Sequence, residues 1–412
     1  MYSDGRPDQK EKFMKQATKT DVTTQPNTRS AAVLTGKPEA GSEASSSEVR
    51  AASTVNLQQI NQDGLISGAV GDPSAFVYGS QIHFLYRDIS GLIWDSFYDP
   101  ISNEGNLQQI AGPGGLNAAP AAAEGPSSYI YFDQTHIIYR AANGAIWDCY
   151  YVTHQSDWLL QQINLGGVSN GPAAVGNPSS FVYGLQTHVL YRAVDGTIWD
   201  SWYPGTGSQW SLQQINLSGA TSAPAAAGDP SPLVYVDQTH IIYRDTGGTI
   251  WDSYYITDQL SWGLQQINLG GLTGGPAAAG DPSPFVYGIQ IHVVYRAVDG
   301  TIWDSWYPGT GSQWLLQQIT PLGILPNGLT GDFILAASDP LAFAYSDQTL
   351  HIVYRDSYGT LWNGYYDSAS GQWVGQQLNV GGAAVGEPAA FLDSQAHVVY
   401  RDAYGYIWEC TF

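Results

Sequence analysis

Residues 188–203, His-Val-Leu-Tyr-Arg-Ala-Val-Asp-Gly-Thr-Ile-Trp-Asp-Ser-Trp-Tyr, are one of seven copies of a hairpin-sized unit in this chain of 412 residues. With the first histidine as position zero, every copy keeps Tyr and Arg at positions three and four, Gly at position eight and Trp at position eleven. Position twelve is Asp in the first five copies, Asn363 in the sixth and Glu409 in the seventh. A fixed period of this kind indicates a repeat architecture rather than several unrelated domains. The copies begin at His83, His136, His188, His240, His292, His351 and His397.

Each full period contains four short apolar runs separated by turn residues. In the period around His240 these runs are residues 232–236, 239–244, 249–255 and 262–268. The invariant Gly at position eight predicts a two-residue hairpin turn with positive φ between the second and third runs. Successive histidines are 46 to 59 residues apart, which is in the range of propeller repeats. The pattern therefore predicts an all-β fold, a seven-bladed β-propeller of four-stranded antiparallel blades.

The two ends of the repetitive region complement each other. It opens at residues 57–60 with Leu-Gln-Gln-Ile, a fourth-strand sequence that no other strand precedes, and it ends at Phe412, after a third strand. Residues 55–61 can therefore supply the outer strand of the blade formed by residues 387–412, which closes the ring and removes an exposed edge. We predict a propeller domain over residues 53–412. Residues 1–52 are polar and lack Trp, and we predict a disordered N-terminal arm.

Charge is distributed unevenly along the chain. Beyond residue 50 there are 29 acidic groups and seven basic ones, and the basic ones are the seven position-four arginines. Such a surface repels phosphate backbones and anionic lipids, so we expect no nucleic-acid or membrane-surface role and favour neutral polar ligands. We find neither a transmembrane-length apolar span nor a signal-peptide pattern, so we expect a protein that is cytoplasmic or released by a non-classical route.

The two cysteines, Cys149 and Cys410, both stand at position thirteen, where the other copies have Ser or Gly. This is a small-residue packing position, so no disulfide framework is indicated. No Cys/His cluster has metal-ligand spacing, and no phosphate-binding glycine loop opens a helix. We therefore expect neither a metal nor a cofactor.

A histidine, a carboxylate and a tyrosine recur at positions zero, twelve and fifteen, and five copies add a Trp at position 22. Aromatic rings pack against the C–H faces of sugars, while sugar hydroxyls require hydrogen-bond donors and acceptors. The repeat therefore predicts a set of carbohydrate sites. The residues expected to contact the ligand are His83, Asp95, Tyr98, His136, Asp148, Tyr151, Trp158, His188, Asp200, Tyr203, Trp210, His240, Asp252, Tyr255, Trp262, His292, Asp304, Tyr307, Trp314, His351, Tyr366, Trp373, His397 and Glu409.

The same residue types could instead form an internal network that holds the blades together. A buried Arg beside Asp and across from Trp satisfies charge, hydrogen bonding and cation–π contact, and we assign the position-four arginines and position-eleven tryptophans to such a framework. Strand alternation cannot decide whether the histidines and acids belong to this framework, because one bulge at the turn reverses which face of the sheet the following side chains occupy. Burial and mutual pairing would favour a protein-interaction scaffold. Placement in pockets between blades would favour a lectin.

The unit resembles the repeat of the fungal fucose-specific propeller lectins of the orange peel mushroom type. In that family an Arg-Val-Tyr-Tyr-Gln strand is followed by Ile-x-Glu, an aromatic residue and a later Trp. The family's sugar-binding Arg and Glu stand twelve apart, as do His188 and Asp200, and its aromatic residue and Trp fall on or near Tyr203 and Trp210. The resemblance covers nearly all of residues 55–412. It implies metal-independent sites between neighbouring blades for fucose or a related neutral sugar.

This chain departs from the family pattern at several positions. The family's Arg is His in all seven copies, its Glu is Asp in five and its Gln is Arg, and its members typically have six blades. A neutral His has fewer donors than Arg, so the resemblance does not imply that fucose specificity is retained. We expect a multivalent, non-catalytic carbohydrate-binding lectin, with a protein-interaction scaffold as the alternative. An enzyme would require one blade with a distinctive residue set, and only the copies with Asn363 and Glu409 depart noticeably.

Overall fold

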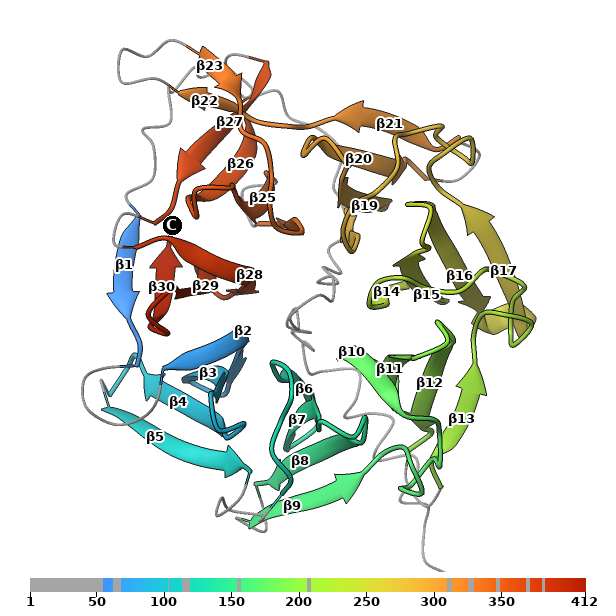
Figure 1. Ribbon diagram of the computed structural model, residues 1–412, viewed down its shortest axis with the longest axis vertical. Coiled ribbons are helices and arrows are strands. Elements are labelled where there is room, and N and C mark those ends of the chain that lie inside the picture. The colour runs from blue at the N-terminus through green and yellow to red at the C-terminus, as the bar shows by residue number, and fades with distance from the viewer. Residues whose placement is uncertain are drawn as a thin grey trace, which may run out of the picture.

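In the computed structural model the chain forms seven β-sheets arranged as blades around a central axis (Figure 1). The structure describes residues 55–61, 68–102, 104–112, 119–153, 157–205, 209–309, 313–324, 330–345, 349–367, 371–379 and 382–412. The predicted arm, residues 1–52, lies outside the described residues. Blades are numbered from blade 1, which contains His83, to blade 7, which contains His397. The predicted seven-bladed, all-β architecture is confirmed.

The four blade strands pair antiparallel with their neighbours, and the first strand lies nearest the axis (Figure 1). Blades 1 to 3 comprise β2 (Ala69–Tyr78), β3 (Gln81–Asp88), β4 (Ile93–Asp99) and β5 (Glu104–Ala111); β6 (Ser127–Tyr131), β7 (Gln134–Arg140), β8 (Ile146–Val152) and β9 (Asp157–Gln162); and β10 (Ala174–Tyr183), β11 (Gln186–Ala193), β12 (Ile198–Tyr203) and β13 (Ser211–Gln214). Blades 4 and 5 comprise β14 (Ser231–Tyr235), β15 (Gln238–Arg244), β16 (Ile250–Ile256) and β17 (Ser261–Gln266), with the 3-10 turn η1 (Thr257–Gln259) before β17; and β18 (Ser283–Tyr287), β19 (Gln290–Arg296), β20 (Ile302–Tyr307) and β21 (Leu315–Gln318). Blades 6 and 7 comprise β24 (Leu341–Ala344), β25 (Leu350–Arg355), β26 (Leu361–Asp367) and β27 (Gln372–Gln377), with β22 (Leu322–Ile324) and β23 (Thr330–Phe333) added outside; and β28 (Ala384–Leu392), β29 (Ala396–Asp402), β30 (Ile407–Thr411) and β1 (Asn56–Gln59).

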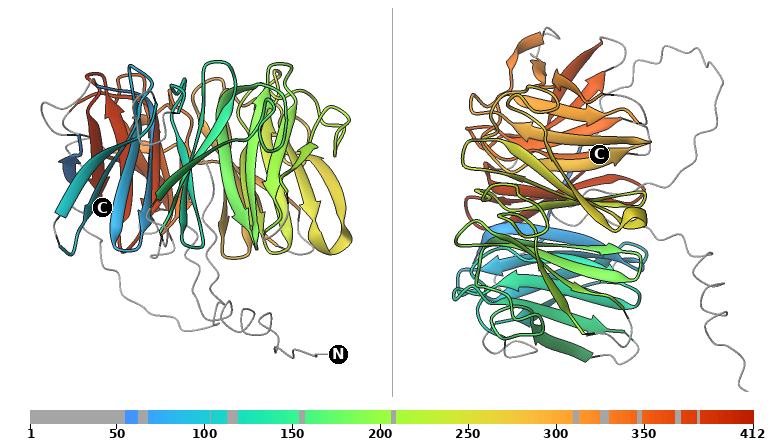
Figure 2. Two further views of the ribbon diagram at one scale, coloured as in Figure 1. Left: turned by 90° about the horizontal axis from the view of Figure 1, so that it is seen from below. Right: turned by 90° about the vertical axis from the view of Figure 1, so that its right-hand side faces the viewer.

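The strands run between the two faces of the ring, and the turns of each blade lie at these faces (Figure 2). We call the face with the turns between first and second strands the first-turn face. We call the opposite face, with the turns between second and third strands, the glycine-turn face. Positions zero, fifteen and 22 lie towards the first-turn face, and position eight lies at the glycine-turn face.

The glycine turn is one residue longer than the sequence predicts. In blade 3 the N–H of Gly196 donates to the carbonyl of Ala193 at 3.0 Å, and the N–H of Ala193 donates to the carbonyl of Thr197 at 2.8 Å. This is a three-residue loop, a β-turn followed by a glycine at φ +81°, rather than a two-residue loop. The predicted positive φ is confirmed. A Cβ on Gly196 would also lie 2.7 Å from the Cβ of Ala225 in blade 4, so glycine permits the close approach of the blades.

The N-terminal strand closes the ring as predicted. β1 pairs antiparallel with β30, and Asn56 lies opposite Thr411 while Gln59 lies opposite Trp408. Figure 1 shows β1 at the outer edge of the sheet that holds the end of the chain. Asn61 extends the closure, because its Oδ1 accepts the N–H of Ile407 at 2.7 Å.

Blade 6 departs from the predicted four strands. Its sheet has six strands, because β22 pairs in parallel with β27 and β23 then pairs antiparallel with β22. The cause is the longest histidine spacing in the chain, between His292 and His351, which supplies the additional hairpin.

The hydrophobic core lies between adjacent blades. Between blades 3 and 4, Phe181, Leu190 and Ile198 pack against Ile241 and Tyr243. Because each blade buries apolar side chains against its neighbours, no blade encloses a core of its own.

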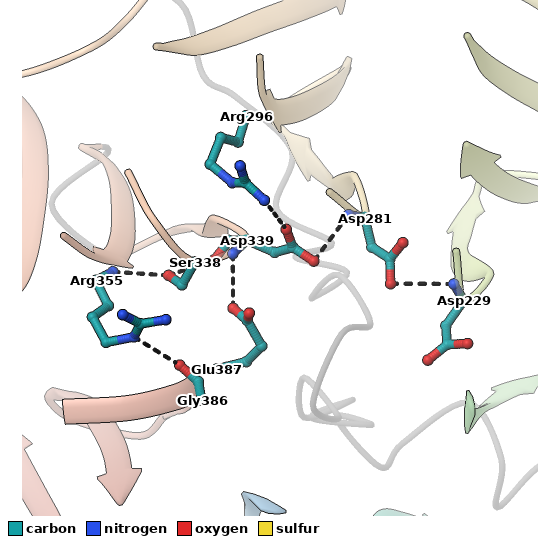
Figure 3. Close-up of polar contacts among 8 residues, drawn as sticks. All are labelled: Asp229, Asp281, Arg296, Ser338, Asp339, Arg355, Gly386 and Glu387. Atoms are coloured by element: carbon teal, nitrogen blue, oxygen red, sulfur yellow. Dashed lines mark hydrogen bonds and ion pairs between the residues drawn. The ribbon is translucent and has the colours of Figure 1, made fainter. Parts of the chain in front are cut away.

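An incomplete ring of blade-to-blade hydrogen bonds runs around the axis from blade 4 to blade 1, and Figure 3 shows part of it. The N–H of Asp229 donates to Asp281 at 3.1 Å, and the N–H of Asp281 donates to Asp339 at 2.9 Å. The N–H of Asp339 donates to Glu387 at 2.8 Å, and that of Glu387 donates to Asp72 of blade 1 at 2.9 Å. Each of these acids precedes a proline at the central cavity. These bonds therefore tie blades 4 to 7 and blade 1 together around the axis.

Position-four arginines lie against this ring, as their assignment to the framework requires (Figure 3). Arg296 donates to Asp339 at 3.4 Å, and Arg355 Nε donates to the carbonyl of Gly386 in the next blade at 3.3 Å. The acids at the axis thus have cationic partners from the blades themselves.

Candidate functional site

The seven histidines are buried, and each contacts the position-twelve side chain of its own blade. The second and third strands place these two residues side by side, and the Nδ1–H of the ring donates to the position-twelve side chain. The Nδ1 distances are 2.9 Å for His83–Asp95, 3.0 Å for His136–Asp148, 2.9 Å for His188–Asp200, 2.8 Å for His240–Asp252, 2.9 Å for His292–Asp304, 3.1 Å for His351–Asn363 and 2.7 Å for His397–Glu409.

Aromatic and glutamine side chains surround these histidine–acid pairs. The His188 ring stacks on Phe181 at 4.5 Å between centroids and lies nearly parallel to Trp202 at 6.0 Å. In blade 2 the side-chain amide of Gln161 donates to Asp148 at 2.8 Å. Equivalent glutamines, the first of each Leu-Gln-Gln sequence, bind the acid in three further blades: Gln108, Gln265 and Gln317. Each histidine and acid is thus paired inside the blade through Nδ1, but the Nε2 atoms of His83 and His188 are buried without a hydrogen-bond partner.

This placement differs from the one expected of residues in open pockets between blades. The position-twelve acids are at most 5% exposed, because two adjacent strands hold them against an imidazole and a glutamine. Burial and mutual pairing are the outcome that the sequence assigns to an internal network. These contacts make the histidines and acids part of the framework that supports the neighbouring aromatic residues, and their contact with a ligand stays a prediction.

Position-eleven tryptophans also belong to the framework. Trp408 Nε1 donates to Asp402 at 3.0 Å, and Trp199 Nε1 donates to the hydroxyl of Thr197 at 2.8 Å, in each case within the glycine turn. Blade 2 is different, because Trp147 Nε1 is buried and has no hydrogen-bond partner.

The predicted tyrosines and tryptophans of positions fifteen and 22 do come together. They face each other across the third and fourth strands, as Tyr255 and Trp262 do in blade 4. All of these tryptophans are half-buried, and the tyrosines are half-buried or exposed. The ring-centroid distances are 5.4 Å for Tyr151–Trp158, 6.0 Å for Tyr203–Trp210, 5.4 Å for Tyr255–Trp262, 6.0 Å for Tyr307–Trp314 and 6.0 Å for Tyr366–Trp373.

A tyrosine from the end of the preceding blade's first strand joins each of these pairs, and the sequence prediction missed it. Tyr131 of blade 2 packs in the cluster that contains Trp210 of blade 3, and its hydroxyl donates to the carbonyl of Leu185 at 2.9 Å. Burial and the neighbouring Tyr203 raise the pKa of Tyr131. The equivalent residues of other blades are Tyr78, Tyr183, Tyr235 and Tyr287. We call each group of three an aromatic junction.

The polar atoms of the five Tyr–Trp pairs remain available. Within the described part of the chain, neither the five indole N–H groups nor the five tyrosine hydroxyls of these pairs make a hydrogen bond or lie among the buried unpaired atoms. By contrast, the hydroxyls of the preceding-blade tyrosines are used: Tyr235, for example, donates to the carbonyl of Ile289 at 2.8 Å. Each junction thus offers two aromatic faces, one N–H donor and one hydroxyl to a ligand.

The two remaining junctions, on either side of blade 7, lack the tryptophan. Tyr98 of blade 1 lies opposite Gly105, so no indole covers it. At the junction of blades 6 and 7, Phe412 takes position fifteen and packs with Val55 and Tyr345. At blade 7 ring closure is the physical reason, because Val55, directly before β1, takes the place that a tryptophan has in other blades.

His397 has a carboxylate on each ring nitrogen. Its Nδ1 lies 2.7 Å from Glu409, and its Nε2 lies 3.0 Å from Asp393. Burial opposes a charge on the ring, but the hydrogen bonds and charges of Glu409 and Asp393 outweigh burial and raise the pKa of His397. Blade 7 therefore favours an imidazolium ion.

In the part of the chain that the structure describes, no three His, Cys, Asp or Glu side chains gather in a way that could hold a metal ion. No helix among the described residues has the length and hydropathy needed to cross a membrane.

Comparison with known proteins supports the fold. No protein-family description and no curated protein matches the sequence. Among solved structures, a lectin from Burkholderia pseudomallei is 18% identical and superposes with a TM-score of 0.58 over 83% of this chain and 95% of that chain. AofleA from Arthrobotrys oligospora is 13% identical, with a TM-score of 0.47 over 80% and 90% of the two chains. The Aleuria aurantia lectin, described as a six-bladed β-propeller with a novel fucose recognition mode, is 14% identical, with a TM-score of 0.42 over 73% and 92%.

The resemblance to propeller lectins is thus confirmed at the level of the fold. The Burkholderia lectin carries this conclusion, because its superposition covers most of both chains.

Proposed function

We propose that this protein is a multivalent, non-catalytic lectin that binds glycans at its aromatic junctions, on the first-turn face. The observation that supports the proposal most directly is the repetition of the Tyr–Trp pair in five blades with its polar atoms unused. A sugar can stack its C–H face on such a pair. Its hydroxyls can accept a hydrogen bond from the indole N–H, and can donate to or accept from the tyrosine hydroxyl.

The charge of the chain narrows the ligand class. An acidic surface disfavours sialylated, sulfated and other anionic glycans, so neutral sugars are the expected ligands. Solved structures of the similar Aleuria aurantia lectin contain α-methyl-L-fucoside, which makes a fucoside the first ligand to test. Single sugar sites are usually weak, and five sites on one face would gain avidity on a glycan-covered surface.

A protein-interaction scaffold is the second candidate. The burial and mutual pairing of the histidines and acids favours it, because each histidine already binds the acid or amide of its own blade through Nδ1. The two candidates differ in what happens at the junctions: a lectin loses glycan binding when they are altered, and a scaffold has no glycan binding to lose.

Glycan-array binding and calorimetry with α-methyl-L-fucoside and other neutral sugars test the proposal. We expect millimolar to micromolar binding with a stoichiometry near five, and a loss of one site in Trp314→Ala. If the alanine variant is too unstable, Tyr307→Ser alters the same site at a more exposed residue. Absence of binding to every neutral glycan by the folded protein would falsify the lectin proposal.

A further inference from the structure

Four of the aromatic junctions fall into two alternating kinds. Tyr–Trp ring distances are 5.4 Å at interplanar angles of 47° and 50° in blades 2 and 4. They are 6.0 Å at 38° and 37° in blades 3 and 5. The residue that flanks the histidine at position fourteen alternates in step, as Tyr150 and Tyr254 in blades 2 and 4, and as Trp202 and Trp306 in blades 3 and 5.

Junctions 1/2 and 3/4 have polar surroundings, and we call them the polar junctions. At junction 1/2 the hydroxyl of Tyr78 lies 2.5 Å from the hydroxyl of Thr153 and 3.3 Å from the carbonyl of Asp133. At junction 3/4 the hydroxyl of Tyr183 lies 3.0 Å from that of Thr257. The first turn of blade 4 supplies Asp237 there, whose carbonyl accepts the N–H of Thr257, as the carbonyl of Asp133 in blade 2 accepts that of Thr153.

Junctions 2/3 and 4/5 have apolar surroundings, and we call them the apolar junctions. The carbonyls that accept the hydroxyls of Tyr131 and Tyr235 there belong to Leu185 and Ile289. These two residues are 61% and 60% exposed. In each case the preceding blade adds an apolar residue directly after the tyrosine that donates this hydrogen bond. Phe132 is 67% exposed, and its ring lies 4.6 Å from that of Tyr131. The equivalent Val236 is 78% exposed.

The backbone at Phe132 and Val236 indicates that folding alone does not explain these residues. Both have φ +54°, a left-handed conformation that bulky and β-branched residues disfavour. The equivalent positions at the polar junctions are Gly79 and Gly184, at φ +64° and +60°, where glycine is unstrained. Strained residues whose side chains remain in solvent gain little from packing, and such strain is characteristic of ligand-contacting positions.

We infer that the ring carries two alternating classes of sugar site. The apolar junctions take a neutral sugar whose apolar substituent, such as the methyl of an N-acetyl group, packs against Phe132 and Leu185 or their equivalents. The polar junctions take a sugar with a hydroxyl or ammonium group at that place, beside the threonine hydroxyl and the turn aspartate. This inference rests on the proposed lectin function. The fifth pair, Tyr366–Trp373, is assigned to neither class, because residues 346–348 lie outside the described residues.

Tryptophan indole signals in ¹⁵N-labelled protein report each site separately once single Trp→Phe variants have assigned them. N-acetylglucosamine and glucosamine form a matched pair of probes, because they differ only in an acetyl group against an ammonium group. With N-acetylglucosamine we expect the signals of Trp210 and Trp314 to shift at about tenfold lower concentration than those of Trp158 and Trp262. With glucosamine the order reverses, by about threefold, because exposed charge pairs are weak.

Two matched variants separate ligand contact from a structural role. Phe132→Gly together with Val236→Gly relieves the strained turns, so the protein should become more stable while its apolar junctions lose about tenfold in affinity for N-acetylglucosamine. Asp133→Asn together with Asp237→Asn should weaken glucosamine at the polar junctions and leave N-acetylglucosamine unchanged.

The outcomes distinguish this inference from the proposal beneath it. If all four signals shift in parallel with both probes, or if the glycine variant keeps full affinity, the two classes do not exist although the lectin function stands. If neither probe nor any glycan on an array shifts or binds, the lectin proposal itself fails.

Discussion

Arg401 Nε donates a 2.9 Å hydrogen bond to the carbonyl of Gly71, across the seam where the last blade meets the first. Arg140 makes the same bond to Gly176 at 2.8 Å. In both cases the glycine lies in a long first strand. The register of that strand shifts directly after the residue that precedes the glycine, and this shift turns the glycine carbonyl towards the arginine. Where the next blade has a short first strand, Nε is buried without a partner, as it is in Arg244.

Replacing Arg401 by lysine should therefore cost more stability than the same change at Arg244. Lysine keeps the charge but lacks the Nε–H that binds the Gly71 carbonyl. The loss of one hydrogen bond costs about 1 kcal/mol. Urea denaturation of the two variants measures the difference. Equal destabilisation would show that the seam bond contributes nothing.

Stability should depend on pH through His397. The folded pKa is raised above the unfolded value of about 6.5, so the stabilisation is fully present below pH of about 6.5 and is lost as pH rises through the folded pKa. Denaturation curves at pH between 5 and 9 measure this slope. Other groups titrate in the same range, so a variant comparison isolates the residue.

Asp393→Asn supplies that comparison. It removes the charge 3.0 Å from His397 Nε2 and keeps a side chain of the same size, so the fall in stability with rising pH should become shallower. An unchanged slope in this variant would assign the pH dependence to another group.

Ala145→Thr should stabilise the protein by about 1 kcal/mol. Trp147 Nε1 is buried without a partner, whereas in blade 3 the equivalent Trp199 donates to Thr197. Asn143 already accepts the N–H of Ala145 at 3.0 Å, as Asp195 accepts that of Thr197. The midpoint of thermal unfolding measures the gain, with Ala145→Val as a control for added size without a hydroxyl.

Asn61 should contribute to ring closure through its acceptor. Asn61→Ala leaves the N–H of Ile407 without a partner, which costs about 1–3 kcal/mol for a buried donor. Asn61→Thr should cost less, because in blade 5 Thr320 accepts the equivalent N–H of Ile302 at 2.9 Å. Chemical denaturation of both variants tests the order, and a threonine variant as unstable as the alanine variant would contradict it.

Much of the fold follows from local pattern. The runs predicted around His240 agree with β14 to β17 to within two residues, because hairpin strands are defined by nearby turns. The predicted length of the glycine turn is wrong by one residue, since a glycine at positive φ occurs in both two-residue and three-residue loops. Pairing of Tyr255 with Trp262 could be anticipated from their fixed offsets, whereas the contribution of Tyr183 from the preceding blade could not.

The sequence by itself determined the seven blades, the closing strand and the positions at which glycine and aromatic residues recur, because each depends on periodicity along the chain. Only the tertiary structure decided that His188 and Asp200 are buried against each other while Tyr203 and Trp210 keep free polar atoms. Whether a side chain is buried depends on the face of the sheet on which it lies and on how the neighbouring blade packs against that face. Contacts between blades join residues far apart along the chain, as Tyr131 and Leu185 are, and no local pattern encodes them.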